Sequence, residues 1–404
     1  MKNSIDLFCT VIDNYGDAGV TYRLAQIMIK IGYTVNLFID NFSVIKKLNT
    51  NIKDYSINVQ GISSVQEIKE QQISQKLTLR YWIPEDSTKY NEEAYRDFSY
   101  TPSQIIIETF QCKLPKEITK TFTHNTVWIN LEYLSAEKWV EDCHKLQSFQ
   151  INNIKKYFFF PGFTAKTGCL NYDENFAKIT KNEALCNTIN EFKNDINISE
   201  DIKKMFKVLI FTYENKALIP LLRAIIKNRP NSIFFLPKGK STQYLENNKI
   251  FNQLLKDHPT VKTVKFEMIN QEKFDDLMKA MDLNVVRGED SFAQANITGT
   301  PFLWHIYPQD EDTHLIKLKA FTDIYAENCT DELRITIEKA FFSLNQSDKE
   351  EKETLSNFNN FMIKYQEICT LSAKWSDHLL KMGNLGRQLD SFIQKTQNIL
   401  KVNK

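Results

Sequence analysis

The fold is decided near the start of the chain, where residues 4–40 have the sequence SIDLFCTVIDNYGDAGVTYRLAQIMIKIGYTVNLFID. Residues 4–12 form an apolar run that predicts a buried strand, and residues 33–40 form a second run of the same kind. Between them, residues 18–30 predict a helix whose apolar face comprises Val20, Leu24, Ile27 and Met28. Gly32 follows as its predicted C-cap. A helix between two such strands indicates a right-handed βαβ unit and a parallel sheet.

Strand-like runs recur along the rest of the chain in two groups. The first group continues at residues 104–108 and 126–131. A polar stretch follows at residues 172–204, and beyond it the second group comprises residues 207–212, 232–236, 261–266, 283–286 and 301–306. Helical segments alternate with these strands, and the chain after residue 312 is predicted to be almost entirely helical. The pattern predicts an α/β protein with two doubly wound, Rossmann-like domains and a linker near residue 190.

We place the domain boundaries at residues 1–185 and 186–375. The remaining residues, 376–404, are predicted to form a C-terminal helical segment that packs back on the first domain. A chain of 404 residues is long enough for two such domains, each with its own core.

Composition excludes several classes of protein. Lys and Arg total 51, Asp and Glu total 50, and the formal charge is +1. This balance argues against a general nucleic-acid binder. The seven cysteines show no CxxC pair, so neither a disulfide framework nor structural zinc is expected. The N-terminus lacks the features of a signal peptide, and no apolar run is long enough to span a membrane. We therefore expect a cytoplasmic protein.

The loop after the first predicted strand carries two carboxylates around a tight turn. Asp13 and Asp17 flank Asn14, Tyr15 and Gly16. Open α/β sheets bind ligands at the carboxyl ends of their strands, so this pair could orient and deprotonate an acceptor. The segment lacks the GxGxxG pattern of dinucleotide-binding loops. A purely structural interpretation is equally supported, because Asn, Gly and Asp form turns and Asp17 could simply cap the helix.

A comparable loop follows a strand in the second domain, where residues 284–292 have the sequence NVVRGEDSF. A helix is predicted to begin near Asp290 or Ser291, after Gly288. Its free N–H groups and positive dipole end suit a nucleotide diphosphate, and Glu289 could accept hydrogen bonds from sugar hydroxyls. The alternative, favoured when this segment is taken alone, is a helix cap with Arg287 in a structural ion pair.

Other strand ends of the second domain carry groups that suit a nucleotide. The ring of Phe211 could stack on a base, Tyr213 could donate to a phosphate, and Gln271 could contact a base edge. Core packing is the better interpretation of Phe211 taken alone, and a solvated helix start is as good for Gln271. No His, Cys or carboxylate spacing typical of a metal site is found, so no metal is expected.

Several segments stand out along almost the whole chain: Asp13–Asp17, Trp128–Glu137, Phe159–Thr164 with Lys166–Gly168, Phe211–Asn215, Arg287–Phe292 and Trp304–Gln309. Taken together, and in this order, they resemble one family, the protein-arginine rhamnosyltransferases (EarP family) that modify translation elongation factor P. Met268 stands where the family usually has a second stacking aromatic residue, and Cys169 replaces a usual glycine.

The resemblance implies a GT-B glycosyltransferase, with two Rossmann-like domains facing across a cleft. The first domain would bind the acceptor and the second the nucleotide sugar. The enzyme would transfer rhamnose, with inversion, from dTDP-β-L-rhamnose to an arginine of elongation factor P. This donor is a substrate, and no cofactor is expected. The implied partner is the N-terminal domain of that factor, with no nucleic acid and no membrane.

The site residues follow from the same resemblance. The catalytic carboxylates match Asp13, Asp17 and Glu289. The donor-binding positions match Asn14, Tyr15, Gly16, Phe211, Tyr213, Gln271, Gly288, Asp290 and Ser291.

Because a guanidinium has a pKa above 12 and a delocalised lone pair, it must be held in plane and deprotonated as it reacts. We assign Asp17 as the general base and Asp13 as its partner. Three alternatives remain open: a GT-B transferase with a glycan or small-molecule acceptor, a nucleotide-sugar epimerase, and a nucleotide-sugar-binding protein without catalysis.

Overall fold

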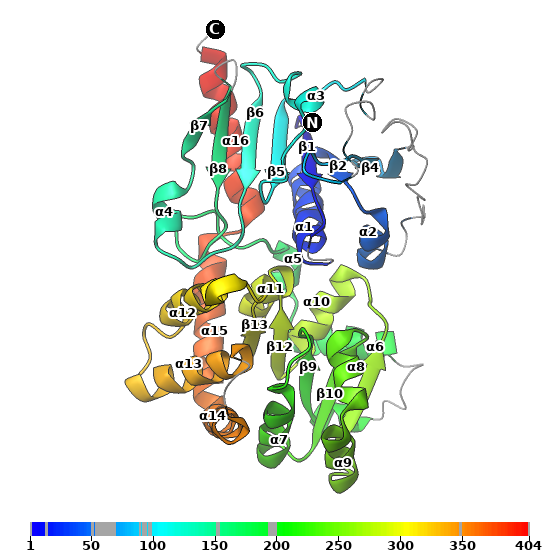
Figure 1. Cartoon of the computed structure of the whole chain (residues 1–404), viewed down its shortest axis with the longest axis vertical. Coiled ribbons are helices and arrows are strands. Elements are labelled where there is room, and N and C mark those ends of the chain that lie inside the picture. Colours follow the sequence, from blue (N-terminus) through cyan, green and yellow to red (C-terminus); the bar gives the residue numbers. More distant parts are fainter. Residues whose placement is uncertain are drawn as a thin grey trace. The chain divides into compact units, whose positions relative to one another are not determined.

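The computed structural model describes residues 2–12, 15–49, 52, 70–88, 90, 95, 99–150, 154–192, 200–346 and 350–402. The chain divides into two compact units (Figure 1). The first comprises Met1–Asp173 and Met382–Lys404, and the second comprises Glu174–Lys381. Each unit is a mixed α/β body around a sheet, and each is described by itself.

The sheet of the first unit has the strand order β3-β4-β2-β1-β5-β6-β8-β7. Its strands are β1 (Ser4–Cys9), β2 (Thr34–Ile39), β3 (Gln71–Ser74), β4 (Leu77–Tyr81), β5 (Ile105–Thr109), β6 (Val127–Leu131), β7 (Gln147–Phe149) and β8 (Lys155–Phe159). The interior pairs are parallel, whereas β3 and β7 pair antiparallel to β4 and β8. The helices of this unit are α1 (Gly16–Ile31), α2 (Phe42–Leu48), α3 (Lys116–Thr119), α4 (Trp139–Cys143) and α16 (Leu385–Val402).

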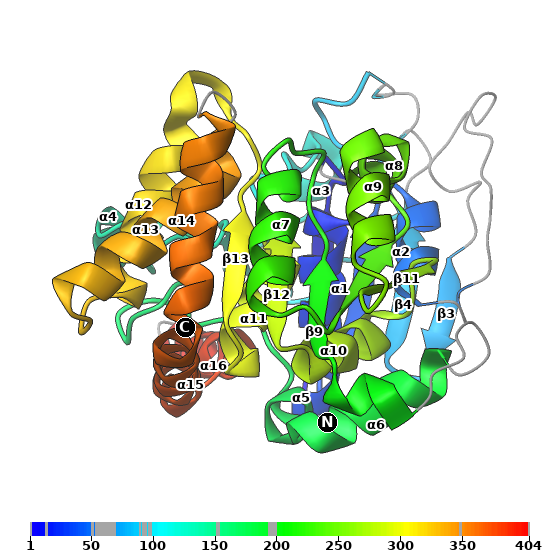
Figure 2. The same ribbon diagram turned by 90° about the horizontal axis from the view of Figure 1, so that it is seen from below.

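The sheet of the second unit has the order β11-β10-β9-β12-β13, with parallel pairing throughout. Its strands are β9 (Phe206–Ile210), β10 (Ser232–Pro237), β11 (Lys262–Phe266), β12 (Leu283–Arg287) and β13 (Phe302–His305). Its helices are α5 (Glu174–Lys178), α6 (Lys181–Phe192), η4 (Glu200–Lys204), α7 (Leu218–Asn228), α8 (Lys240–Asn247), α9 (Lys249–Asp257), α10 (Gln271–Ala280), α11 (Asp290–Thr298), η5 (Asp310–Asp312), α12 (Thr313–Tyr325), α13 (Asp331–Asn345), α14 (Glu351–Ile363) and α15 (Tyr365–Met382). Within this unit α14 lies alongside α7 (Figure 2).

The predicted βαβ unit is confirmed, with shifted ends. Strand β1 ends at Cys9 rather than at residue 12, because the next backbone N–H groups donate to side-chain carboxylates instead of to a neighbouring strand. The Val11 N–H donates to Asp40 Oδ1 at 3.0 Å, and the Ile12 N–H donates to Asp17 Oδ2 at 2.9 Å. Helix α1 ends as predicted at Gly32, whose φ of 115° is accessible to glycine and whose N–H bonds the carbonyls of Met28 and Ile29.

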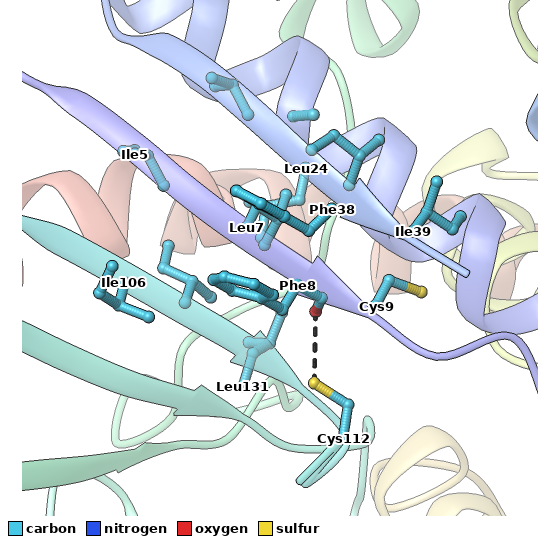
Figure 3. Close-up of a cluster of buried hydrophobic side chains, with 14 of the residues drawn as sticks. Ile5, Leu7, Phe8, Cys9, Leu24, Phe38, Ile39, Ile106, Cys112 and Leu131 are labelled. Carbon is cyan, nitrogen blue, oxygen red and sulfur yellow. Dashed lines mark hydrogen bonds between the residues drawn. The ribbon is translucent and has the colours of Figure 1, made fainter. Parts of the chain in front are cut away.

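The core of the first unit forms around β1. Phe8 and Phe38 stack across the β1–β2 pair with ring centroids 4.3 Å apart (Figure 3). In the same view the Cys112 thiol, which follows β5, points at the carbonyl of Phe8, 3.7 Å away. Aromatic and aliphatic side chains from three parallel strands therefore pack together, as expected where parallel strands are buried on both faces.

The linker predicted near residue 190 is wrong, because residue 190 lies within α6. That helix packs against α10 and belongs to the second unit. The division between the units falls after Asp173 rather than after residue 185. The polar composition that indicated a linker is that of a surface helix, with Ala184, Thr188 and Phe192 buried.

The C-terminal helix α16 is part of the first unit. It lies beside α1 and against β6 (Figure 1). Its apolar side chains Leu385, Leu389 and Ile393 are fully buried in the first core. Asp390 accepts hydrogen bonds from Lys2 Nζ at 2.5 Å and from the Tyr33 hydroxyl at 2.8 Å, and these contacts fasten the helix near the start of β1.

A single glycine sets the distance between α16 and α1. Gly386 is buried, and a methyl group at this position would lie 2.3 Å from Ile27 Cγ2 and 3.1 Å from Ile31 Cδ1. We expect Gly386→Ala to lower the free energy of unfolding of the first unit by about 1–3 kcal/mol, the usual cost of overpacking. Urea denaturation followed by circular dichroism measures this change.

The matched control is Gly239→Ala in the second unit, where a methyl group would have no neighbour within 4 Å. It should change stability by less than about 0.5 kcal/mol. Adding Ile27→Ala to Gly386→Ala should recover part of the loss in a double-mutant cycle. Strictly additive effects of the two substitutions would contradict the proposed clash.

Candidate active site

The carboxylate of Asp17 is held at the carboxyl edge of the first sheet. Asp17 lies in the first turn of α1 and is only 3% exposed. Its Oδ2 accepts the Ile12 N–H, and its Oδ1 accepts a hydrogen bond of 3.3 Å from the Tyr133 hydroxyl. The alternative that Asp17 caps the helix is wrong, because the N-cap residue is Tyr15 and no side chain makes a cap hydrogen bond there.

The other predicted residues of this loop have different positions. Asp13 and Asn14 lie outside the described residues. Tyr15 is half-buried against the first core, and the Lys47 ammonium lies 5.5 Å from its ring centroid. Gly16 is the first residue of α1. The loop therefore places the Asp17 carboxylate beside Tyr15 and Gly16 at the strand end.

The ends of β5 and β6 lie next to Asp17. The β6 end belongs to the segment Trp128–Glu137 that resembles the family, whereas Phe110 and Gln111 after β5 were not predicted as part of the site. The rings of Phe110 and Tyr133 stack with centroids 4.1 Å apart and planes 12° apart. Beside them, Glu132 accepts hydrogen bonds from the side-chain amides of Gln111 and Asn130. Burial raises the pKa of Glu132, and the two amide hydrogen bonds act in the opposite direction.

In the second unit, Arg287 stands between two of the predicted nucleotide-binding rings. Its guanidinium carbon lies 4.7 Å from the ring centroid of Phe211 and 4.8 Å from that of Tyr213. Phe211 also meets Phe274 edge-on at 5.1 Å. An ion pair of Arg287, the structural alternative, is not found within the described residues. The arginine instead forms cation–π contacts at the carboxyl ends of β9 and β12.

The predicted helix start after β12 is confirmed, since α11 begins at Asp290. Glu289 is its N-cap residue and makes no side-chain cap hydrogen bond, so the alternative of an Asp or Ser N-cap is wrong. Gly288 has a φ of 61°, which favours glycine, and its carbonyl accepts the Trp304 indole N–H at 2.8 Å. The turn between β12 and α11 is therefore stabilised by a side chain of β13.

Polar side chains around the start of α11 form hydrogen bonds within the protein. The Gln271 amide donates to Asp290 Oδ2 at 3.0 Å, which links the first residue of α10 to the first residue of α11. The Ser291 hydroxyl donates to the carbonyl of Arg287. The structure therefore brings Gln271, Asp290 and Ser291 together at the edge where Arg287 also lies.

His305 supports this edge from within the core. It ends β13 opposite Arg287, and its ring meets that of Tyr213 at 5.3 Å. Burial, together with the charge of Arg287 and the nearby His314, lowers the pKa of His305 to about 4. The imidazole is therefore neutral at neutral pH and packs against Tyr213.

Neither a metal-binding cluster nor a membrane-spanning helix is found among the described residues. Over the described ranges, no group of three or more His, Cys, Asp or Glu side chains is placed to hold a metal ion. Among the helices that the structure describes, none combines the length and apolar character needed to cross a bilayer.

Comparisons with known proteins point to one family. The profile of the family described as elongation-factor P (EF-P) rhamnosyltransferase EarP matches residues 5–394. A protein-arginine rhamnosyltransferase of Shewanella oneidensis is 32% identical, and the alignment covers 97% of this chain and 98% of that protein. Its counterpart in Pseudomonas aeruginosa is also 32% identical, over 80% of this chain and 81% of that protein.

Solved structures agree on the fold. A structure described as the basis for EarP-mediated arginine glycosylation of translation elongation factor EF-P is 19% identical, with a TM-score of 0.58, and 98% of this chain and 99% of that chain are covered. Arabidopsis thaliana UGT89C1, solved with quercetin, is 10% identical with a TM-score of 0.53 and the same coverage. The predicted fold class, a GT-B glycosyltransferase with two parallel-sheet domains, is confirmed. Because the family profile and the Shewanella relative match nearly the whole chain, the chain belongs to the EarP family of protein-arginine rhamnosyltransferases.

Proposed function

We propose that this enzyme transfers L-rhamnose from dTDP-β-L-rhamnose to an arginine side chain of elongation factor P, with inversion at the anomeric carbon. The observation that carries the proposal is the Asp17 carboxylate, which a backbone N–H and a phenol hold at a strand end. The relatives' names, which specify rhamnose and arginine, agree with it, as does the description of the similar solved structure.

In the proposed reaction, an arginine Nη attacks the anomeric carbon from the face opposite the diphosphate. The bond from that carbon to the diphosphate oxygen breaks, and its electron pair leaves with dTDP. Asp17 takes the proton that the nitrogen loses, and Asp13 shares in holding the guanidinium. A carboxylate suits both tasks, because it binds a guanidinium in plane and is ionised at neutral pH.

The second unit would hold the donor. The backbone N–H groups of the first turn of α11, at the positive end of the helix dipole, would stabilise the charge that develops on the diphosphate. Tyr213 would donate to a phosphate, and the positive charge of Arg287 lies at the same edge. Glu289 would hold the sugar, and Asn14, Tyr15 and Gly16 would complete the donor contacts. The start of α11 and Arg287 would supply the positive potential that a metal ion supplies in other glycosyltransferases, so the proposal needs neither metal nor cofactor.

The thymine would stack on Phe211. This ring already contacts Phe274 and the Arg287 guanidinium, so the base would use the part of the ring that these two leave exposed. Met268, in the loop between β11 and α10, is half-buried and could supply a polarizable thioether in place of the family's second aromatic ring.

The test of the proposed function compares three acceptors: intact elongation factor P, its isolated N-terminal domain, and a linear peptide bearing the same arginine. Asp17 alone would bind any guanidinium, so specificity requires a folded partner surface, and Glu132 would contact basic residues beside the target. With dTDP-rhamnose, mass spectrometry should show one added deoxyhexose on the first two at similar rates and little on the peptide. No mass increase on the intact factor would refute the proposal and favour another acceptor.

We expect Asp17→Asn to lower the rate of transfer by orders of magnitude, because the amide cannot accept a proton from the guanidinium. It keeps one oxygen for the Ile12 N–H, so the thermal midpoint should fall only slightly and donor affinity should stay unchanged. Rate assays, calorimetry with dTDP and thermal melts measure these three quantities.

Asp390→Asn provides the matched control, since Asp390 also accepts a hydrogen bond from a tyrosine hydroxyl, that of Tyr33, but lies on α16 near the start of β1. This substitution should lower the thermal midpoint and leave the transfer rate unchanged. Loss of stability and activity in equal measure for Asp17→Asn would assign Asp17 a structural role only.

Donor binding gives a further prediction. Phe211→Ala should weaken dTDP binding by about 1–3 kcal/mol through lost stacking, and Tyr213→Phe should weaken it by removing one phosphate donor. Isothermal titration calorimetry measures both. Phe206→Ala is the control: Phe206 also has a cation–π contact, with Arg229, but at the amino end of the same strand. If all three variants bind dTDP alike, the nucleotide site lies elsewhere.

A further inference from the structure

The chain adopts an unfavourable backbone conformation directly after β5. Phe110 and Gln111 have φ values of 56° and 54°, in the left-handed region that non-glycine residues avoid. The segment persists because neighbouring contacts fix it: the Phe110 N–H donates to the Leu131 carbonyl at 2.7 Å, and the Gln111 N–H donates to Asn130 Oδ1 at 3.1 Å. Strain of this kind is found where the surrounding structure must place particular side chains.

The strained pair places two side chains against the residues that follow β6. The ring of Phe110 stacks on that of Tyr133, and the amide of Gln111 donates to Glu132 Oε1 at 2.9 Å. The two strand ends therefore meet in two consecutive contacts, one between rings and one between polar groups. Tyr133 and Glu132 are therefore positioned by Phe110 and Gln111, whose own backbone is constrained.

Tyr133 is the member of this group that reaches the proposed base. Its hydroxyl donates to Asp17 Oδ1, although Asp17 belongs to α1 and lies 116 positions away in the sequence. Tyr133 is nonetheless 43% exposed, which is unusual for a large ring that is stacked and hydrogen-bonded. An exposed ring beside a carboxylate is a suitable platform for a planar cation.

The electrostatics of the neighbouring residue favour the same ligand. Glu132 is 8% exposed, and both donors identified for its carboxylate are neutral amides, from Gln111 and Asn130. Among the described residues no Lys or Arg pairs with it. Burial raises the pKa of Glu132, but the two amide donors stabilise its ionised form without cancelling its charge, so a negative charge adjoins Tyr133 in the sequence.

We propose that Tyr133 is an acceptor-positioning residue: its hydroxyl aims the Asp17 carboxylate, and its ring, backed by Phe110, carries the guanidinium of the acceptor. This inference rests on the proposed function, in which Asp17 is the base. The stacked ring fixes the plane of the guanidinium, and the carboxylate in contact with the same phenol accepts the proton from the attacking nitrogen. The two tasks belong to different parts of one side chain, so they can be separated.

The experiment compares Tyr133→Phe and Tyr133→Leu in the full-length enzyme, with intact elongation factor P as acceptor. Tyr133→Phe keeps the ring and loses the hydrogen bond to Asp17, so kcat should fall about tenfold with little change in KM for the factor. Tyr133→Leu also loses the platform, so KM should rise at least fivefold in addition. The same variant should weaken binding of the factor, measured by calorimetry without donor.

Tyr157→Phe is the matched control, because Tyr157 lies on β8 with its ring against Phe392, and its hydroxyl bonds no other described residue. It should leave kcat, KM and the thermal midpoint unchanged. A purely structural role of Tyr133 would lower the thermal midpoint of both variants and reduce active enzyme without separating kcat from KM. That result, or kinetics like those of the control, would overturn the inference while transfer by the wild type upheld the proposed function. Failure of the wild type both to bind and to modify the factor would overturn both.

Discussion

Parallel pairing of β1, β5 and β6 is the constraint on which the first half of the site depends. Parallel neighbours end at the same edge of a sheet, so the residues that follow each strand meet there whatever their separation along the chain. Asp17 follows β1, Phe110 follows β5 and Tyr133 follows β6, and these three side chains form one connected set. The same holds in the second sheet, where β9 and β12 are parallel neighbours: Phe211 follows β9, Arg287 ends β12, and the two side chains meet.

The buried carboxylates of the first unit differ in the partners that stabilise their charge. Asp6 accepts hydrogen bonds from Asn36, Tyr100 and Ser103 within the sheet, and Glu108 forms an ion pair with Lys156, whose pKa burial lowers to about 8. These groups are satisfied locally and serve the core. Glu132 lies at a strand end, and both donors identified for its carboxylate are neutral amides, so its charge is not paired with a cation among the described residues.

The two doubly wound domains could be predicted because apolar runs of strand length alternate with amphipathic helices, and this signal depends only on burial. Strands β3, β4, β7 and β8 were missed. Strands β3 and β7 are short edge strands whose side chains are largely exposed, and β4 and β8 beside them alternate buried with partly exposed residues instead of forming an apolar run. Gly32 and Gly288 could be placed in turns, since glycine is the residue that such backbone angles favour. Phe110 and Gln111 carry no such signal, because nothing in their side chains indicates a left-handed backbone. The part of the site that they support therefore emerged only from the structure. At Cys169 a departure from the family was visible in the sequence, and its consequence is now clear: this cysteine has a φ of 62°, where the usual glycine would be unstrained.

The division of the chain makes the second unit an insertion into the first. In the sequence, residues 174–381 separate the strands of the first unit from α16, the helix that completes its core. During synthesis, the strands around β1 leave the ribosome long before Leu385, Leu389 and Ile393 exist, and part of their apolar surface lacks its final partner for that whole period. The second unit, continuous in sequence, can close its own core as soon as α15 has emerged. Although it begins first, the first unit is therefore the last to finish folding, and an interruption of translation after residue 381 would leave a folded second unit joined to an incomplete first one.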